Sequence, residues 1–160
     1  MNKIPIKQII ITTIIAIFLN LIDFGTYANI LEPIWILIFL NYFLINFELK
    51  NEYFIALILG VIIDATSGNI IGQSSLALIV SSYFIITIKS SIKIANITTI
   101  IIFVAISSVL YMATILAIHI IVQGFDLNYN VLIPIITTAM AYPLISTIIN
   151  YFNGKNKRSF

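Results

Sequence analysis

The segment Gly60–Gly72 combines one carboxylate with small and hydroxylated residues, the types that shape polar sites. Its acid, Asp64, is the only charged residue between Glu52 and Lys89, and long apolar runs flank it. An ionisable side chain inside a membrane domain is costly unless it faces a partner, a cavity or water. Asp64 could therefore bind a partner's cation, a small solute or a proton. The Gly/Ser/Asn-rich sequence around it predicts a break in the helix at this point.

The same residues also have a purely local interpretation. Asp, Ser, Thr and Asn favour turns and helix caps, so Ser67 or Asn69 could cap the span that follows. The sequence leaves open whether this segment is a binding site, a cap or both.

Glycine spacing adds a packing hypothesis. Gly68 and Gly72 are four residues apart, a spacing that allows another helix to approach closely. Together with Ser75 they would lie near one face of the following span, and Gly60 could serve the same packing from the preceding span.

No pattern typical of an enzyme or a metal site accompanies this segment. The chain has no cysteine and one histidine, His119, which has no carboxylate at helical spacing. The sequence contains no Gly-x-Ser-x-Gly elbow, no His-Glu-x-x-His motif and no phosphate-binding loop. We expect no enzymatic activity and no cofactor or metal.

The elements that position these residues are membrane spans. Hydrophobic residues make up 61% of the chain and charged residues 9%, whereas soluble domains have about 25% charged residues. The composition therefore predicts an all-α integral membrane protein, and a net charge of +2 is no evidence for nucleic-acid binding. The apolar runs are 8–22, 33–47, 53–63, 70–88, 94–122 and 131–152.

The distribution of charge favours six crossings over five. With six crossings and a cytoplasmic N-terminus, all eight basic residues lie on the cytoplasmic side, as the positive-inside rule requires. The alternative treats 53–88 as one crossing and would move five of these residues outside. We therefore predict one domain over 1–152, followed by a basic cytoplasmic tail over 153–160.

The third run is short for a membrane span. Its eleven residues rise only about 16 Å as a helix, against a hydrocarbon core of about 30 Å. This span must either extend into the Asp64–Gly68 region or stop part-way through the membrane.

Two prolines mark helix features. Pro33 suits a position near the first turn of a helix, and Trp35 then lies where an interfacial indole belongs. Pro143 lies inside the last run, where it should kink the helix and leave the carbonyl of Ala139 without its helical hydrogen bond. The hydroxyl of Thr138 or Ser146 could compensate for that lost bond.

The pattern as a whole resembles the MreD family of bacterial rod shape-determining membrane proteins. The resemblance rests on Gly60-x3-Asp64-x2-Ser67-Gly68-x3-Gly72, on Pro33-x-Trp35 about 25 residues earlier, and on Tyr142-Pro143 in the last span. The length, the six runs and the basic tail also fit. One departure is the second cytoplasmic loop, where Glu48 and Glu52 outnumber Lys50.

The resemblance implies a non-enzymatic scaffold of the cell-elongation machinery in the bacterial cytoplasmic membrane. Its implied partner is the single-span protein MreC and, through it, MreB, RodA and a class B penicillin-binding protein. The implied fold is a compact six-helix bundle similar to the substrate-binding subunits of energy-coupling-factor transporters, with residues 64–72 closing over a groove. The residues expected to form the partner-binding or structural motif are Gly60, Asp64, Ser67, Gly68, Gly72, Ser75, Pro33, Trp35 and Pro143.

Two alternative functions remain open from the sequence. The first is a small-solute binding subunit of a transporter, which would need an enclosed polar pocket. Its candidate lining residues are Asp64, Thr66, Ser67, Asn69, Gln73, His119 and Gln123. The second is a membrane enzyme acting on a lipid-linked precursor through Asp64 or His119.

Overall fold

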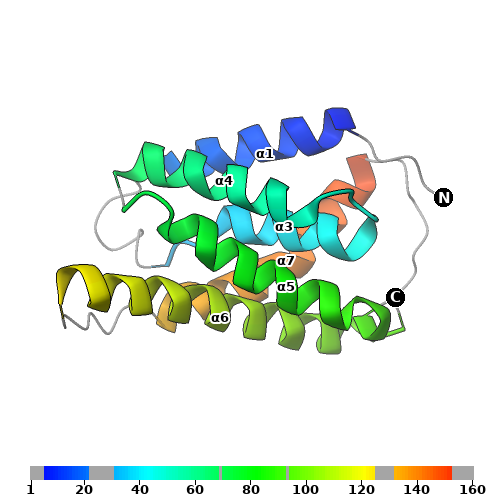
Figure 1. The fold of residues 1–160 in the computed structure, drawn as a ribbon. Helices are drawn as coiled ribbons and strands as arrows, with labels where there is room; N and C mark the ends of the chain where they lie inside the picture. The colour runs from blue at the N-terminus through cyan, green and yellow to red at the C-terminus, as the bar shows by residue number, and fades with distance from the viewer. Residues whose placement is uncertain (1–5, 22–30, 69, 93, 125–131, 153–160) are drawn as a thin grey trace.

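The computed structural model describes residues 6–21, 31–68, 70–92, 94–124 and 132–152, and all regular structure in these residues is α-helical (Figure 1). The helices are α1 (Ile6–Leu21), α3 (Trp35–Asn46), α4 (Glu52–Ser67), α5 (Gln73–Ile92), α6 (Ile97–Gln123) and α7 (Leu132–Phe152). They coincide with the six predicted apolar runs, and the all-α prediction is confirmed. By length and composition, α5, α6 and α7 can each cross a membrane.

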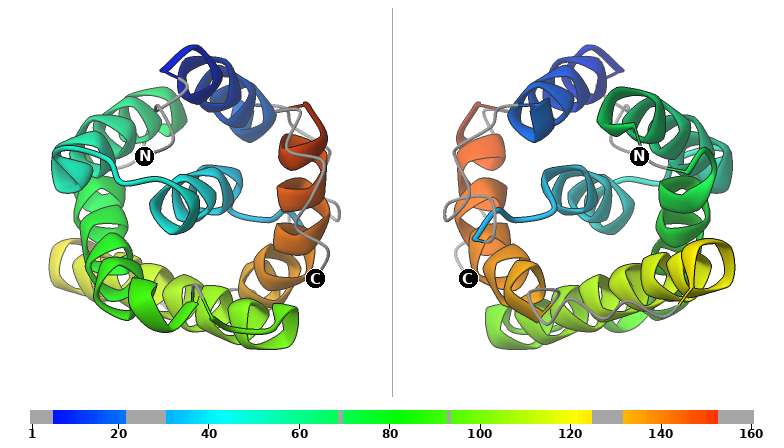
Figure 2. Two further views of the ribbon diagram at one scale, coloured as in Figure 1. Left: turned by 90° about the vertical axis from the view of Figure 1, so that its right-hand side faces the viewer. Right: turned by 90° about the vertical axis from the view of Figure 1, so that its left-hand side faces the viewer.

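Helix α3 lies inside a ring formed by the other five helices (Figure 2). Nine of its twelve residues are buried, because it is apolar all round. Around it, α4 packs along α5, α5 along α6, and α6 along α7. Helix α3 itself contacts α1, α5 and α7 most extensively. The core of the protein is therefore built around one short central helix.

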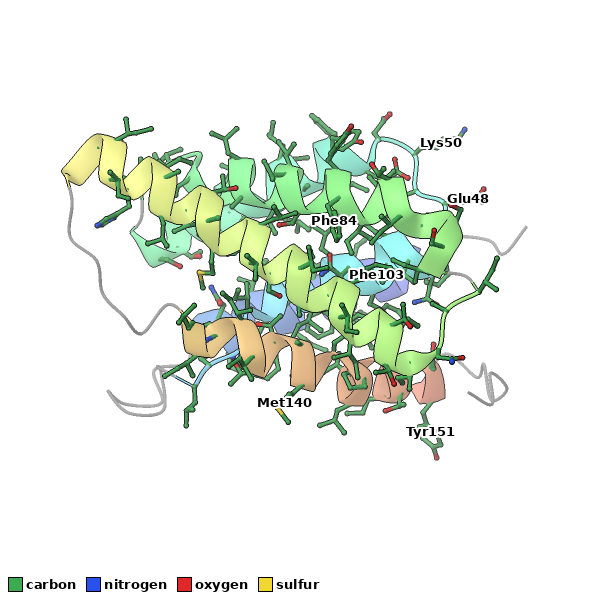
Figure 3. The ribbon with its side chains drawn as sticks, turned by 90° about the horizontal axis from the view of Figure 1, so that it is seen from below. Glu48, Lys50, Phe84, Phe103, Met140 and Tyr151 are labelled. Carbon is green, nitrogen blue, oxygen red and sulfur yellow. The ribbon has the colours of Figure 1, made fainter. Side chains whose placement is uncertain are left out.

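Successive helices run in opposite directions, so α1 begins at the end of the bundle where α7 finishes (Figure 1). We call this the basic end, because Lys50 lies there (Figure 3) and Lys89 is in the last turn of α5. Glu48 lies at the same end. Glu32 and Asp64 lie towards the opposite end, at the start of α3 and the end of α4. This separation agrees with the predicted charge pattern. The tail 153–160 lies outside the described residues.

Of the two outcomes left open for the third span, the structure shows extension into the Asp64–Gly68 region, and the predicted helix break at Asp64 is wrong. Helix α4 continues to Ser67, giving sixteen residues and a length of about 24 Å. Asp64 lies in the last turn of this helix, and the chain leaves helical geometry only at Gly68.

The predicted roles of Thr138 and Ser146 beside Pro143 also need correction. The Thr138 hydroxyl donates to the carbonyl of Pro134, and the Ser146 hydroxyl donates to that of Pro143. Neither bonds the carbonyl of Ala139, one turn before Pro143. Thr138 instead accepts a hydrogen bond from the backbone N–H of Ile34 at 2.9 Å, which ties α7 to the start of α3.

Candidate functional site at the α4–α5 turn

Asp64 joins the end of α4 to the beginning of α5. Its Oδ2 accepts a hydrogen bond from the N–H of Gly72 at 2.7 Å, and its Oδ1 accepts one from the N–H of Ser74 at 3.0 Å. The side chain is 1% exposed. The first amides of a helix have no partner within the helix, and the helix dipole favours a negative charge beside them. Asp64 therefore caps α5 from the neighbouring helix.

This geometry settles the local interpretation of the motif. A carboxylate from α4 supplies the cap of the following helix, where the sequence pointed to Ser67 or Asn69. Ser67 is exposed, and Asn69 lies outside the described residues. Burial and two short hydrogen bonds account for Asp64 without any external cation.

The same corner is linked to α6. The side chains of Ser74 and Tyr111 are hydrogen-bonded, and the Asp64 carboxylate is close enough to Tyr111 to interact with it electrostatically. Gln73 Nε2 donates to the carbonyl oxygen of Ile115 at 3.1 Å. The start of α5 is therefore fixed to both of its neighbours in the ring.

Helices α4 and α5 approach each other closely at Gly60. A Cβ atom there would lie 2.2 Å from the Cα and 2.3 Å from the backbone N of Ser75. Ser75 in turn donates from Oγ to the carbonyl of Leu57 at 3.1 Å. The predicted packing role of Gly60 is confirmed. We call Gly60, Asp64, Gly72, Ser74 and Ser75 together the α4–α5 clasp.

The predicted packing stripe of Gly68, Gly72 and Ser75 is wrong. Gly68 ends α4 with φ 67°, and Gly72 precedes α5 with φ 97°, so neither lies on the α5 face. A Cβ atom at either position would meet nothing within 4 Å. Their role is conformational, because glycine adopts positive φ without steric cost and commonly ends helices.

The clasp supports a short exposed turn. Thr66, Ser67 and Gly68 are exposed, and Ile71 is 78% exposed although it is a large aliphatic residue. The hydroxyl of Thr66 donates to the carbonyls of Ile62 and Ile63, within its own helix. We call residues 66–68 and Ile71 the exposed turn.

A second polar group in the core was missed by the sequence reasoning. Asn41, in the middle of α3, is fully buried, and its Nδ2 donates to Ser107 Oγ of α6 at 3.2 Å. Ser81 of α5 donates to the Ser107 carbonyl at 3.0 Å. These bonds join three helices at mid-bundle. The available signal was one amide side chain inside the otherwise apolar run 34–45.

Pro33 and Trp35 have structural roles here. Pro33 lies just before α3, which begins at Trp35. The indole Nε1 of Trp35 donates to Glu32 Oε1 at 3.0 Å. His119 is partly exposed on α6, and the described residues contain no group of three or more side chains able to hold a metal ion.

The cavity between α1, α3 and α4 is very small. Its volume is about 10 Å³, and its lining includes Phe39, Phe43 and Leu59. Small-molecule sites typically have volumes of about 300–1,000 Å³ and a few converging polar groups. This cavity has room for about one water molecule and an apolar lining.

Three of the ring helices, α5, α6 and α7, are long and apolar enough to cross a membrane. The side chains of Asp64 and Ser75 are used in hydrogen bonds within the protein. These features are typical of a helical integral membrane protein. The model of the family described as rod shape-determining protein MreD matches residues 2–154. The chain therefore belongs to the MreD family of rod shape-determining membrane proteins, as the resemblance indicated. Searches of curated proteins and of solved structures gave no match.

Proposed function

We propose that this protein is a non-enzymatic scaffold of the bacterial cell-elongation complex that binds MreC. Through MreC it would act with MreB, RodA and a class B penicillin-binding protein to support peptidoglycan synthesis. Its place would be the cytoplasmic membrane, crossed six times, with both termini in the cytoplasm. Membership of the MreD family over residues 2–154 is the observation that carries this proposal.

The way the polar groups are used supports a scaffold rather than a catalyst. Both carboxylate oxygens of Asp64 accept backbone hydrogen bonds, and the side chain is 1% exposed. A general acid or base must reach the proton that it transfers, and this carboxylate is occupied and enclosed. The cavity of about 10 Å³ beside α3 is too small and too apolar to serve as the pocket of a solute-binding subunit.

The exposed turn is the surface that we assign to MreC. Ile71, at 78% exposure, offers an apolar anchor beside the hydroxyl groups of Thr66 and Ser67. Buried apolar anchors surrounded by polar groups are typical of protein interfaces. In this proposal Asp64 holds the turn in place without touching the partner. The juxtamembrane segment of MreC, outside the membrane, would be the part that contacts it.

The test replaces Ile71 by Glu in the tagged protein within its own host. We expect MreC to be lost from the purified complex and the cells to lose rod shape, while the amount of the variant in the membrane is unchanged. The matched control is Ile94→Glu, because Ile94 is 89% exposed and lies at the basic end of the bundle. Equal recovery of MreC with both variants would remove the exposed turn from the proposal.

A further inference from the structure

Tyr83 places a hydroxyl-bearing side chain on the outer surface of a membrane span. It is 63% exposed, and α5 is one of the helices long and apolar enough to cross a membrane. It lies ten residues after Gln73 and nine before Ile92, about 15 Å and 14 Å from the helix ends. Exposed Tyr53 and Tyr151 lie near helix ends, where aromatic side chains reach the membrane interface. Tyr83 is at mid-depth.

The Tyr83 hydroxyl has no hydrogen-bond partner among the described residues. Apart from the backbone bonds of the helix, the hydrogen bond at this residue uses its backbone carbonyl, which accepts from Thr87 Oγ1 at 2.8 Å. Hydrocarbon offers no partner for a phenol, so exposure at this depth costs free energy. A second polar group at the same depth would remove that cost.

The exposed residues around Tyr83 form a regular stripe. Leu76, Val80, Tyr83, Thr87 and Ser90 are all exposed, with spacings of four, three, four and three residues. This is the seven-residue repeat by which two helices pack along each other as a coiled coil. We call these five residues the α5 seam. In the ring, α5 lies between α4 and α6, and α6 separates it from α7 (Figure 2).

We propose that the α5 seam is the interface of a parallel homodimer in which the Tyr83 side chains of two copies share a hydrogen bond. A two-fold axis along the membrane normal brings each residue opposite itself, so both tyrosines lie at the same depth. A phenol both donates and accepts, which makes the pair self-complementary. Leu76 and Val80 then meet their own counterparts in the apolar half of the seam, and Thr87 and Ser90 do so near the basic end.

Disulfide cross-linking tests this dimer directly, because the chain has no cysteine of its own. Val80→Cys keeps Tyr83 and lies on the α5 seam. Met140→Cys is the matched control, since Met140 is 69% exposed, lies near the middle of α7 and points away from the bundle (Figure 3). In native membranes under mild oxidation, we expect a dimer band with Val80→Cys and little or none with Met140→Cys.

The contribution of the hydroxyl is tested by adding Tyr83→Phe to the Val80→Cys chain. We expect dimerisation about threefold weaker, the size of an average interhelical hydrogen bond in a membrane. Adding Thr87→Val instead should change little, because the Thr87 hydroxyl is satisfied within its own helix. The proposal would be overturned if Val80→Cys gave no dimer, or if Met140→Cys gave as much dimer as Val80→Cys. It would also be overturned if Tyr83→Phe had no effect on dimerisation, or if Val80→Cys were cross-linked to a different protein.

Discussion

Gly60→Ala is the substitution that most directly tests the α4–α5 clasp. The new Cβ would lie 2.2 Å from the Cα of Ser75, and carbon atoms in contact prefer about 3.5–4.0 Å. The nearest atoms belong to the backbone of α5, so relief requires the two helices to separate by more than about 1 Å. That movement would stretch the 2.7 and 3.0 Å hydrogen bonds that Asp64 accepts.

The direction of the stability change caused by Gly60→Ala shows whether the two helices are in close contact there. An ordinary Gly→Ala change inside a helix stabilises it by about 0.5–1 kcal/mol. Overpacking costs about 1–3 kcal/mol, and a change of 1 kcal/mol shifts Tm by about 2–4 °C in a chain of this size. We therefore expect Gly60→Ala to lower the Tm of the detergent-solubilised protein by roughly 2–12 °C.

A second substitution separates backbone from side-chain contact. Ser75→Gly removes the Ser75 side chain but leaves its Cα and N, the two atoms nearest to the added Cβ. We expect Ser75→Gly not to restore the stability of Gly60→Ala, as measured by thermal unfolding of both variants and the double variant. A Gly60→Ala protein as stable as the parent, or more stable, would refute the reasoning.

Three further polar contacts are tested by substitution in the same unfolding assay. Asp64→Ala leaves two amides unsatisfied and should lower the stability by about 2–3 kcal/mol. Asp64→Asn keeps one acceptor and should lower it less. Equal losses of stability in the two variants would contradict the role of Asp64 as a helix cap. Asn41→Leu should lower the stability by about 1–3 kcal/mol, and adding Ser107→Ala should recover much of that loss. If the stability losses of the two single variants simply add in the double variant, the result would argue against a bond between these residues. Lys89→Met removes the ammonium group that donates to the carbonyl of Phe47 and should lower stability by about 1 kcal/mol, and unchanged stability would show the contact to be unimportant.

The helices were predictable because hydropathy in a membrane protein is a strong signal. Even the shortest run gave a useful constraint, since a fixed membrane thickness sets a minimum helix length. The sequence left open whether this span extends into the Asp64–Gly68 region or stops part-way, and α4 continues to Ser67. The central position of α3 could not be read in the same way. A membrane-facing helix is apolar on every side, as is a helix buried in the bundle, so the sequence does not distinguish the two.

Four of the five clasp residues were singled out from the sequence, but Ser74 and the geometry of the clasp were not. Spacing alone does not separate a glycine needed for close approach, such as Gly60, from glycines needed for positive φ, such as Gly68 and Gly72. The bond between Asn41 and Ser107 joins residues 66 positions apart. A contact that distant depends on how the helices are arranged in the bundle, which the local pattern around Asn41 does not contain.

The most direct test of the proposed scaffold function is to purify the tagged protein from gently solubilised native membranes and identify what accompanies it. We predict recovery of MreC together with other proteins of the cell-elongation machinery. Recovery of a coupling ATPase with a bound small molecule, and no MreC, would contradict the scaffold and favour a transporter subunit.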